Sequence, residues 1–383
     1  MDFSKMFTDH YTVVLLCVMA AGWVVVCLYY GLFYFRVGRA RQARAEKDAG
    51  VRLPPVSVVL TAQNDSQWLK SNLVYLLEQD YPTFEVVVVD YLSTDETTFV
   101  LKLLAENYKH LKVVTFTENA SGYQGKKYPM SIGIKSAKYD LLLLTEPDCM
   151  PTDLTHFGWI REMVAGYGRK QVDIVLGYCG IQGKKSLFNW LQQYDNLDYS
   201  VEYLGAALLH APFTGNGRNL SYRRSLFMKN GGFIYHYFVP DGADDMFVNQ
   251  NCSRHNTAVV LSADSFTTVP PRRTVAEWRS YRRHRMATHV YYGFWLKVGR
   301  LLRPLSVAVF YLAGVLLLLR GMVPWELLAG VLVVKLAWQV AATAQAVRRL
   351  SISPVVCWLS PLFEIYFLIA NTFLSIIPLS KKN

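Results

Sequence analysis

The sequence is short of charged residues and has no cysteine pattern that indicates cross-linking or zinc binding. Charged residues make up 18% of the 383-residue chain, below the roughly 25% of an average soluble domain. The six cysteines include no close pair of the kind that binds zinc, and Cys17, Cys27 and Cys357 lie in apolar segments. We therefore expect reduced thiols in a domain that faces the cytosol.

Signals for histidine-bound metals, repeats and nucleic-acid binding are also missing. His156, His210, His236 and His255 do not have the spacing of metal ligands, and the chain has no internal repeat or low-complexity tract. The net charge is +11, yet no base-reading motif accompanies it, and the basic residues gather beside apolar segments. We therefore expect the basic residues to contact membrane lipids, and we do not expect the protein to bind nucleic acid.

The shortage of charged residues is marked near the N-terminus, where the sequence has a long apolar segment. Residues 11–35 are almost wholly apolar and uncharged, and about 20 such residues suffice to span a bilayer. A dense basic run comes next, whereas a cleaved signal peptide has its basic residues first. We predict an N-terminal transmembrane helix within residues 1–35 and a basic juxtamembrane linker over residues 36–55, on the cytoplasmic side.

The C-terminal part of the chain is apolar again. Residues 288–303 mix aromatic, aliphatic and basic residues, which predicts an amphipathic helix on the bilayer surface. A C-terminal transmembrane region over residues 304–383 is expected next. Pro361 and Glu364 leave open whether its last segment crosses fully or is broken. Three candidate spans lie at about residues 304–319, 323–343 and 354–378.

Between the apolar ends, residues 56–287 alternate between strand and helix patterns. The strand patterns include VVVV and LLLL, which are typical of strands covered on both faces of a parallel sheet. The β-α-β-α-β order predicts an α/β, Rossmann-like domain with a mostly parallel sheet. The predicted strands are residues 56–60, 84–89, 112–116 and 140–144, and the predicted helices are residues 66–78, 95–108 and 128–138.

Acidic residues come directly after two of these strands, at the edge of the sheet where such folds bind ligands. Asp90 closes the strand 84–89 and can accept a hydrogen bond from a nucleobase or ribose, with a turn or cap as the equal alternative. Glu146 and Asp148 come after the strand 140–144. Two carboxylates at this spacing can face one magnesium or manganese ion, which would stabilise a departing diphosphate. A solvated acidic loop is the alternative.

A second acidic pair and several basic residues complete the candidates. Asp244 and Asp245 precede a helical pattern; alone they favour helix capping, with a general base as the alternative, one acid raising the pKa of the other. Arg282 and Arg283 suit a diphosphate, with membrane-surface charge as the alternative. Lys126 comes after a glycine turn and can meet phosphate.

Taken in order, these segments resemble the inverting family 2 glycosyltransferases with the GT-A fold, over about residues 55–289. The resemblance implies a GT-A domain that binds a nucleotide diphosphate sugar together with a divalent cation, Mg²⁺ or Mn²⁺. It is carried by VSVVLTAQNDSQWLKSNLVYLLEQDYPTFEVVVVD, GKKYPMSIGIKSAKYDLLLLTEPDC, FTGNGRNLSYRRSLF with NGGF, and ADDMF.

The resemblance also implies a role for each matching residue. Asp148 would bind the metal, with Glu146 near the metal or the ribose. Asp245 would be the catalytic base, beside Asp244. The acceptor side would be formed by Gly215, Asn216 and Gly217, and the donor side by Thr61, Ala62, Gln63, Asp65, Asp90, Lys126, Glu146, Arg282 and Arg283.

The sequence departs from the family pattern at several places. Tyr91 stands where a second acid usually comes after Asp90, and Glu146 replaces the first aspartate of the metal motif. Processive synthases of the family carry Gln-x-x-Arg-Trp, where this chain has Ser280, Arg283 and His284. This departure, with only about four spans, favours single-sugar transfer over polymer synthesis.

Together these patterns predict an integral membrane enzyme of the bacterial inner membrane with a cytoplasmic catalytic domain. It would move a sugar, from a UDP-sugar, with inversion onto a lipid or lipid-linked glycan acceptor, in cell-envelope glycan biosynthesis. A processive polysaccharide synthase and a catalytically inactive scaffold are the alternatives. A transporter is disfavoured, since Lys335 and Glu364 are the one pair of intramembrane charges in the sequence.

Overall fold

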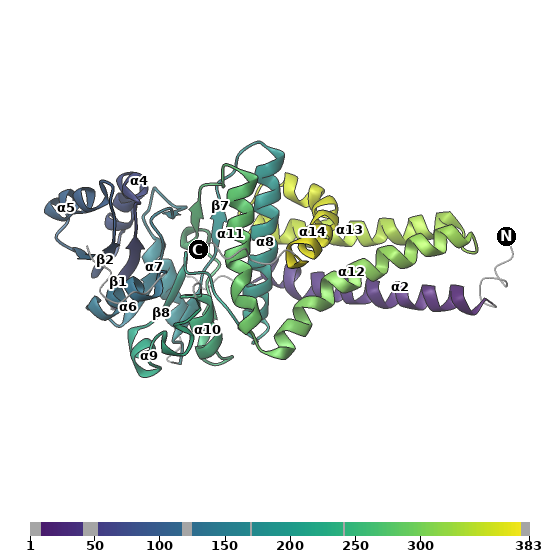
Figure 1. The fold of residues 1–383 in the computed structure, drawn as a ribbon, viewed down its shortest axis with the longest axis horizontal. Helices are drawn as coiled ribbons and strands as arrows, with labels where there is room; N and C mark the ends of the chain where they lie inside the picture. The colour runs from purple at the N-terminus through teal and green to yellow at the C-terminus, as the bar shows by residue number, and fades with distance from the viewer. Residues whose placement is uncertain (1–8, 41–52, 117–124, 169–170, 240–241, 377–383) are drawn as a thin grey trace. The chain divides into compact units, whose positions relative to one another are not determined.

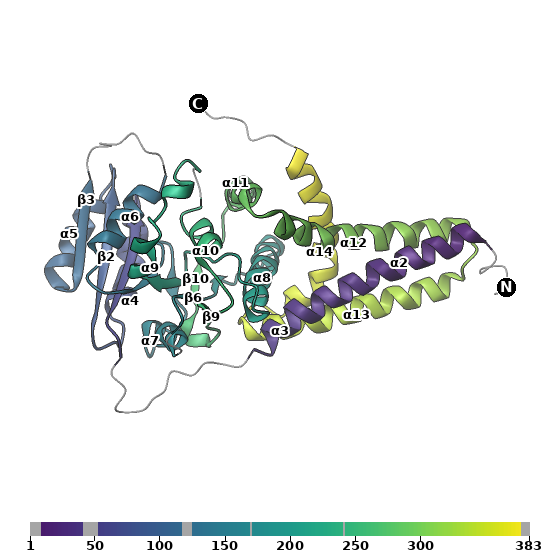
Figure 2. The same cartoon turned by 90° about the horizontal axis from the view of Figure 1, so that it is seen from below.

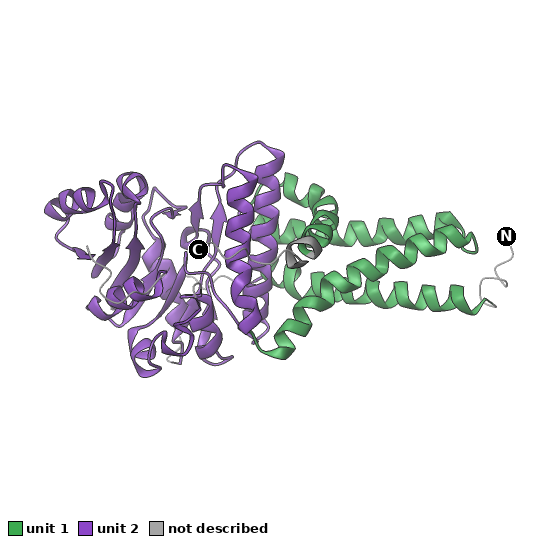
Figure 3. Cartoon of the chain, viewed as in Figure 1, with its two compact units in different colours: residues 1–39, 292–348, 352–383 green, residues 40–291, 349–351 purple. Residues whose placement is uncertain are grey.

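The computed structural model describes residues 9–40, 53–116, 125–168, 171–239 and 242–376, with side chains up to residue 371. The chain divides into two compact units (Figure 3). The apolar unit comprises residues 1–39, 292–348 and 352–383, and the α/β unit comprises residues 40–291 and 349–351. Of the basic linker predicted over residues 36–55, residues 41–52 lie outside the described part.

The α/β unit is built on a seven-stranded sheet with the order β3-β2-β1-β4-β8-β6-β9. The first four strands along the chain pair in parallel, and β8 runs antiparallel to both of its neighbours. This arrangement confirms the predicted α/β fold with a mostly parallel sheet. The strands are β1 (Val56–Ala62), β2 (Phe84–Tyr91), β3 (Leu111–Phe116), β4 (Leu141–Leu144), β6 (Ile174–Leu176), β8 (Leu220–Arg223) and β9 (Thr257–Val259).

Helices cover both faces of the parallel strands. Val58 and Leu60 of β1 belong to the core cluster that includes Leu69 and Leu73 of α4 (Ser66–Leu77). On the opposite face, α6 (Lys127–Ser136) packs so closely that a Cβ at Gly133 would lie 2.7 Å from Val59. Successive strand residues point to opposite faces, so the uninterrupted apolar runs are explained by helices on both sides.

The predicted elements agree with the structure to within a few residues. The helix α5 (Thr97–Asn107) begins two residues later than predicted, because the Asp95 carboxylate accepts hydrogen bonds from the backbone N–H groups of Thr97 and Ser66. This local bonding favours a turn over a helical start. The register then brings Ala62 at the end of β1 opposite Asp90 at the end of β2.

The rest of the α/β unit holds a small second sheet and three helices that matter for the site. The small sheet has the order β5-β10-β7. Helices α8 and α11 run side by side (Figure 1), joined by ion pairs from Asp195. The elements are β5 (Met150–Pro151), β7 (Cys179–Ile181), β10 (Thr267–Val269), α8 (Leu187–Leu208), α10 (Asp245–Asn251) and α11 (Val275–Ala287).

The apolar unit consists of long helices, and within the described residues three of them are long and apolar enough to cross a membrane (Figure 2). These are His10–Gly38, Phe294–Arg320 (α12) and Trp325–Arg349 (α13). The first is α2 (His10–Tyr29) continued by a π-helical turn (Tyr30–Tyr34) and α3 (Phe35–Gly38). A further apolar helix, α14 (Val355–Ile376), contains Pro361.

The boundary expected between an interfacial helix and a span does not coincide with a helix end. Residues Thr288–Tyr291 form a short 3-10 turn, and α12 then runs without a break through Pro304. A proline removes one backbone hydrogen bond, but apolar helices tolerate it where local adjustments and neighbouring helices satisfy the freed groups. The interfacial position of residues 288–303 stays a prediction.

The apolar unit contains a buried group of polar side chains, which we call the apolar-unit cluster (Tyr30, Tyr311, Lys335, Gln339 and Glu364). Lys335 contacts the Glu364 carboxylate and donates to Gln339 Oε1 at 2.7 Å and Tyr311 Oη at 3.0 Å. Tyr30 donates to Glu364 Oε1 at 2.9 Å. Lys335 and Glu364 are 1% and 5% exposed, so the predicted intramembrane charges form one buried pair.

Candidate functional site

A cleft of about 300 Å³ lies in the α/β unit. Its walls come from the start of α6, the loop after β4, the loop before β8, the start of α10 and helix α11. The structure therefore brings together segments that are far apart in the sequence. The predicted site residues that line the cleft are Lys126, Glu146, Gly215, Asn216, Gly217, Asp244 and Asp245.

Glu146 and Asp148 converge on one cationic group, Arg218. The Arg218 Nη2 atom lies 2.8 Å from Glu146 Oε2 and 3.2 Å from Asp148 Oδ2. Lys126 Nζ lies 3.0 Å from Glu146 Oε1, and Arg272 Nη2 lies 3.5 Å from Asp148 Oδ2. Burial acts to raise the pKa of Glu146, but Arg218 and Lys126 outweigh it and lower the pKa to about 2. Glu146 is thus held as a carboxylate.

The two carboxylates fit a divalent ion as part of its ligand set. Both direct an oxygen at the same guanidinium nitrogen, so a single cation can reach both. Among the described residues, no group of three or more His, Cys, Asp or Glu is placed to hold a metal ion. Glu146 and Asp148 would therefore need further oxygen ligands, and magnesium commonly takes them from substrate phosphates and water.

The second acidic pair differs between its two members. Asp244 is the N-cap residue of α10, but its side chain makes no capping hydrogen bond. Burial raises the pKa of Asp244 to about 7, with Glu146 and Asp245 adding to the effect. Asp245 accepts hydrogen bonds from the Thr288 hydroxyl and, at 2.8 Å, from the backbone N–H of Met246. Burial thus favours the protonated form of Asp244, while hydrogen bonds hold the Asp245 carboxylate in a fixed orientation.

Gly217 permits the close approach of Asp244. A Cβ atom at position 217 would lie 1.8 Å from Asp244 Oδ2, far closer than any side chain allows. The glycine predicted for the acceptor side thus serves to place a carboxylate in the cleft. Arg218, the next residue in the same FTGNGRN segment, was not predicted; its charge beside the glycines of that segment was the only available signal.

The predicted nucleoside residues lie at the ends of β1 and β2. Asp90 is 0% exposed; one oxygen accepts from the Thr98 hydroxyl at 2.5 Å, and Oδ1 has no hydrogen-bond partner in the described part of the chain. Such an orphaned acceptor fits a donor from a ligand. Asp65 accepts from the backbone N–H of Gln63 at 2.9 Å.

Asp65, near the ends of the parallel strands, interacts electrostatically with charged residues at the cleft. Burial raises the pKa of this carboxyl; Lys126 acts to lower it, and Asp148 and Glu146 act to raise it. These interactions require Asp65 to lie within electrostatic reach of the cleft acids. Thr61 and Ala62 precede it at the end of β1, 7% and 2% exposed, so they contribute backbone more than side chain to this edge.

The positions of Arg282 and Arg283 differ from the prediction that they face a diphosphate. Arg282 is 4% exposed, and its Nε donates to Asp195 Oδ1 of α8 at 3.0 Å. Arg283 is exposed. Neither lines the cleft in the described structure; the helical period of α11 instead turns Tyr281, His284 and Arg285 toward it.

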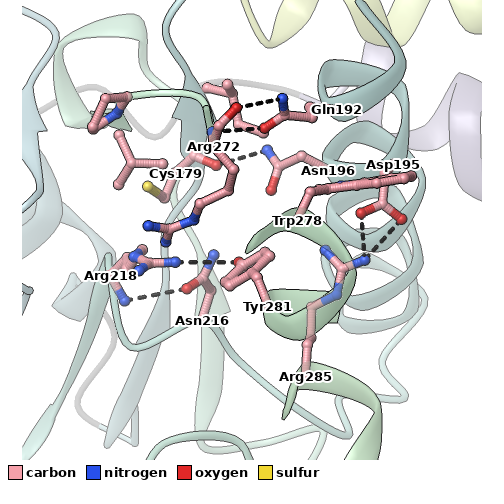
Figure 4. Close-up of a pocket in the computed structure, with 13 residues that line it drawn as sticks. Cys179, Gln192, Asp195, Asn196, Asn216, Arg218, Arg272, Trp278, Tyr281 and Arg285 are labelled. Atoms are coloured by element: carbon pink, nitrogen blue, oxygen red, sulfur yellow. Dashed lines mark hydrogen bonds and ion pairs between the residues drawn. The ribbon is translucent and has the colours of Figure 1, made fainter. Parts of the chain in front are cut away.

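Guanidinium groups gather around Tyr281 on one side of the site (Figure 4). The ring centroid lies 5.3, 5.0 and 5.7 Å from the Cζ atoms of Arg218, Arg272 and Arg285. Arg285 also donates to both oxygens of Asp195, at 2.9 and 2.8 Å. Arginines presented on an aromatic ring beside an open cleft are suited to an anionic ligand such as a diphosphate.

Curated relatives match parts of the chain. The chain is 23% identical over 174 residues to the poly-β-1,6-N-acetyl-D-glucosamine synthase of Staphylococcus epidermidis, covering 45% of this chain and 40% of that protein. It is 32% identical over 94 residues to the β-monoglucosyldiacylglycerol synthase of a Nostoc species, covering 24% of this chain and 20% of that protein. The chain thus spans less than half the length of either relative.

One solved structure matches nearly the whole chain. This is the mannosyltransferase PcManGT of Pyrobaculum calidifontis in complex with GDP-Man and Mn²⁺, with a TM-score of 0.57, 21% sequence identity, and coverage of 90% of this chain and 99% of that one. At this identity the likeness shows the fold, and it confirms the GT-A architecture that the sequence predicted.

The sequence profile of glycosyl transferase family 21 matches residues 15–374. This match includes the parallel strands, the cleft residues and the long apolar helices. The resemblance to family 2 enzymes had indicated the same activity and fold. The protein is a glycosyltransferase with a GT-A domain and candidate membrane helices, and the chain belongs to glycosyl transferase family 21.

Proposed function

We propose that this enzyme transfers a sugar with inversion from a nucleotide diphosphate, a UDP-sugar, to a hydroxyl group of a lipid or lipid-linked glycan at the cytoplasmic face of the bacterial inner membrane. The observation that carries the proposal is one cleft lined by Glu146, Asp244, Asp245 and Arg218, with Asp148 paired to Arg218 beside it. Inverting transfer needs a stabilised leaving group and a base in one site.

The charges of the cleft support the assignment of the donor side. Lys126, Arg218 and Arg272 supply the positive groups that a diphosphate requires. The unpartnered Oδ1 of Asp90 is proposed to accept an N–H of the base. Glu146 and Asp148 would hold the divalent ion, which when bound neutralises charge on the departing diphosphate.

The reaction step assigns the proton to Asp245. Its carboxylate takes the proton of the acceptor hydroxyl as the oxygen attacks the anomeric carbon from the face opposite the diphosphate. The nucleoside diphosphate leaves with the electron pair of the broken bond. The Thr288 hydroxyl and the Met246 N–H hold the Asp245 carboxylate in place, which supports its assignment as the base over its neighbour Asp244.

The acceptor assignment is supported by the apolar unit and by one relative. Three helices of the described structure are long and apolar enough to cross a membrane, which would keep the chain at a lipid surface. The Nostoc relative is named for a lipid product, β-monoglucosyldiacylglycerol. The Staphylococcus epidermidis relative is named for a polymer, and this favours processive synthesis as the second candidate.

A donor panel tests the proposal. The purified full chain, in lipid nanodiscs with and without Mn²⁺, is incubated with UDP- and GDP-sugars and a membrane-lipid extract, and released nucleotide and lipid products are measured. We expect Mn²⁺-dependent release of UDP and a lipid with one added sugar. Asp245→Asn should still bind UDP but release none. A polymer would establish the second candidate, and no release with any donor would reject both.

A further inference from the structure

Arg218 occupies the place between the two carboxylates that the proposed metal ion would need. Its side chain is 12% exposed, the same fraction as that of Asp148. Burial opposes its charge, but Glu146 and Asp148 raise the pKa of Arg218 well above its usual value. Arg218 is therefore a permanent cation, and it cannot give up the site by losing a proton.

The guanidinium group also has unused bonding capacity. Nη1 donates to Tyr281 Oη at 3.2 Å, while Nε is buried and has no hydrogen-bond partner in the described structure. Buried arginine donors are normally satisfied, so this nitrogen indicates an acceptor that arrives with a ligand. A phosphate oxygen is such an acceptor, and it would meet an arginine already presented on an aromatic ring.

The backbone of Arg218 is fixed, which leaves the side chain as the part that can turn. Its N–H donates to Asn216 Oδ1 at 3.2 Å. Its carbonyl accepts from the hydroxyls of Thr145 at 3.4 Å and Thr267 at 3.0 Å. A rotation about side-chain bonds therefore suffices to move the charge between neighbouring anions, without a movement of the loop.

We propose that Arg218 is a resident counter-cation of Glu146 and Asp148, which competes with the divalent ion and turns to the donor diphosphate when ion and donor bind together. The inference rests on the proposed function and deepens it. While no nucleotide is present, the ion must displace a paired arginine; once the diphosphate is present, the displaced arginine gains a partner. Metal and nucleotide therefore bind cooperatively, each raising the affinity for the other by the same factor.

The wild-type protein provides the first test. Binding of Mn²⁺ alone, UDP alone and Mn²⁺ at saturating UDP is measured on the full chain in nanodiscs, with free Mn²⁺ detected by electron paramagnetic resonance. We expect UDP to raise the affinity for Mn²⁺ at least about tenfold, within the usual range of coupling between sites. Binding of both without coupling overturns the inference; no binding of UDP at all would instead reject the proposed function.

Variants separate competition from a structural role. In Arg218→Met, Mn²⁺ alone should bind about tenfold more tightly, while UDP in the presence of Mn²⁺ should bind about tenfold more weakly. Arg218→Lys keeps the charge but has no planar fork to bridge two acids, so it should show a smaller change in both affinities.

A matched control lies five residues further along. Arg223 also pairs with two carboxylates, Asp140 at 3.2 Å and Asp173 at 3.4 Å, and it is outside the cleft. Arg223→Met should leave both affinities unchanged. If Arg218→Met and Arg218→Lys both bind Mn²⁺ more weakly than the wild type, the arginine merely holds the acids in place and the inference is wrong; should the methionine variant fail to fold, Arg218→Lys decides alone.

Discussion

Two groups of opposite charges in the described structure, one in each unit, differ in how completely the bonding capacity of their charged side chains is used. In the apolar-unit cluster, Lys335 has acceptors on three neighbours and both Glu364 oxygens are engaged. At the cleft, Arg218 Nε and Asp90 Oδ1 lack partners in the described structure, and the pKa of Asp244 is raised to about 7. Charged groups that have all their hydrogen-bond partners within the protein serve to fix its packing. Charged groups that lack partners and lie beside a cleft indicate a ligand.

Pairs of opposite charges therefore have different roles in the two units. A buried pair contributes little net stability, but removing one member leaves an uncompensated charge, which is strongly destabilising. A cleft charge has solvent and ligands to replace a lost partner, so its removal should change chemistry more than folding. Substitutions in the cleft and in the apolar-unit cluster should therefore differ in which property they change.

The largest effect is expected from the proposed metal site. Asp148→Asn removes one of the two carboxylates that meet at Arg218, so a divalent ion would lose a charged ligand and the leaving diphosphate would be less stabilised. We expect the rate of nucleotide release to fall about 10²- to 10³-fold, with the melting temperature nearly unchanged. The control is Asp140→Asn, an acid paired with Arg223 outside the cleft. Equal loss of activity in both variants would contradict the assignment.

The second-largest effect is expected on stability, from a substitution in the apolar unit. Glu364→Gln leaves Lys335 buried without its counter-charge, which should cost about 3–5 kcal/mol in the free energy of unfolding. The double variant Lys335→Met with Glu364→Gln should recover most of that loss, because neither charge of the pair is then left buried without the other. Unfolding in detergent micelles, monitored by circular dichroism, measures both. Additive losses in the double variant would show that the two charges do not form a functional pair.

Much of the α/β unit was predictable because its signals are local. Uninterrupted apolar runs predict strands covered on both faces, and the parallel order places the residue after each strand at one shared edge of the sheet. For that reason Asp90, at the end of β2, and Glu146, just after β4, could be predicted to lie at this shared edge before any coordinates. Their separation in sequence did not matter, since the topology alone brings strand ends together.

The parts that could not be predicted depend on tertiary packing. Arg218 meets Glu146 across 72 positions of sequence, through a loop whose course no periodicity describes. Helix α11 has few apolar residues, so its sequence did not show which face packs on α8. The structure directs Arg282 to Asp195 and turns Tyr281 and His284 toward the cleft. Neighbouring arginines in one run thus have different surroundings.

A smaller effect on activity is expected from a substitution that changes the shape of the cleft. Gly217→Ala places a methyl group where the Asp244 carboxylate lies, 1.8 Å from Oδ2, so the carboxylate must move. We expect nucleotide release to fall about 10- to 100-fold, in keeping with the cost of a displacement of about 1 Å in an active site. Gly183→Ala, with its nearest neighbour 3.9 Å away, is the control and should keep full activity.

The smallest effect is expected on the pH dependence of stability, to which the cleft residue Asp244 should contribute. Because the pKa of Asp244 is about 7 in the folded protein, against about 3.9 in an unfolded chain, the folded state holds this proton more tightly. Its contribution to stability is therefore fully present below about pH 4 and is lost as the pH rises to about 7. Asp244→Asn should remove this slope, so that the wild type gains a few degrees in melting temperature relative to the variant between pH 8 and pH 5. Scanning fluorimetry at several pH values measures it, and parallel curves for the two proteins would show that Asp244 ionises normally and that the cleft is no less satisfied than the apolar-unit cluster.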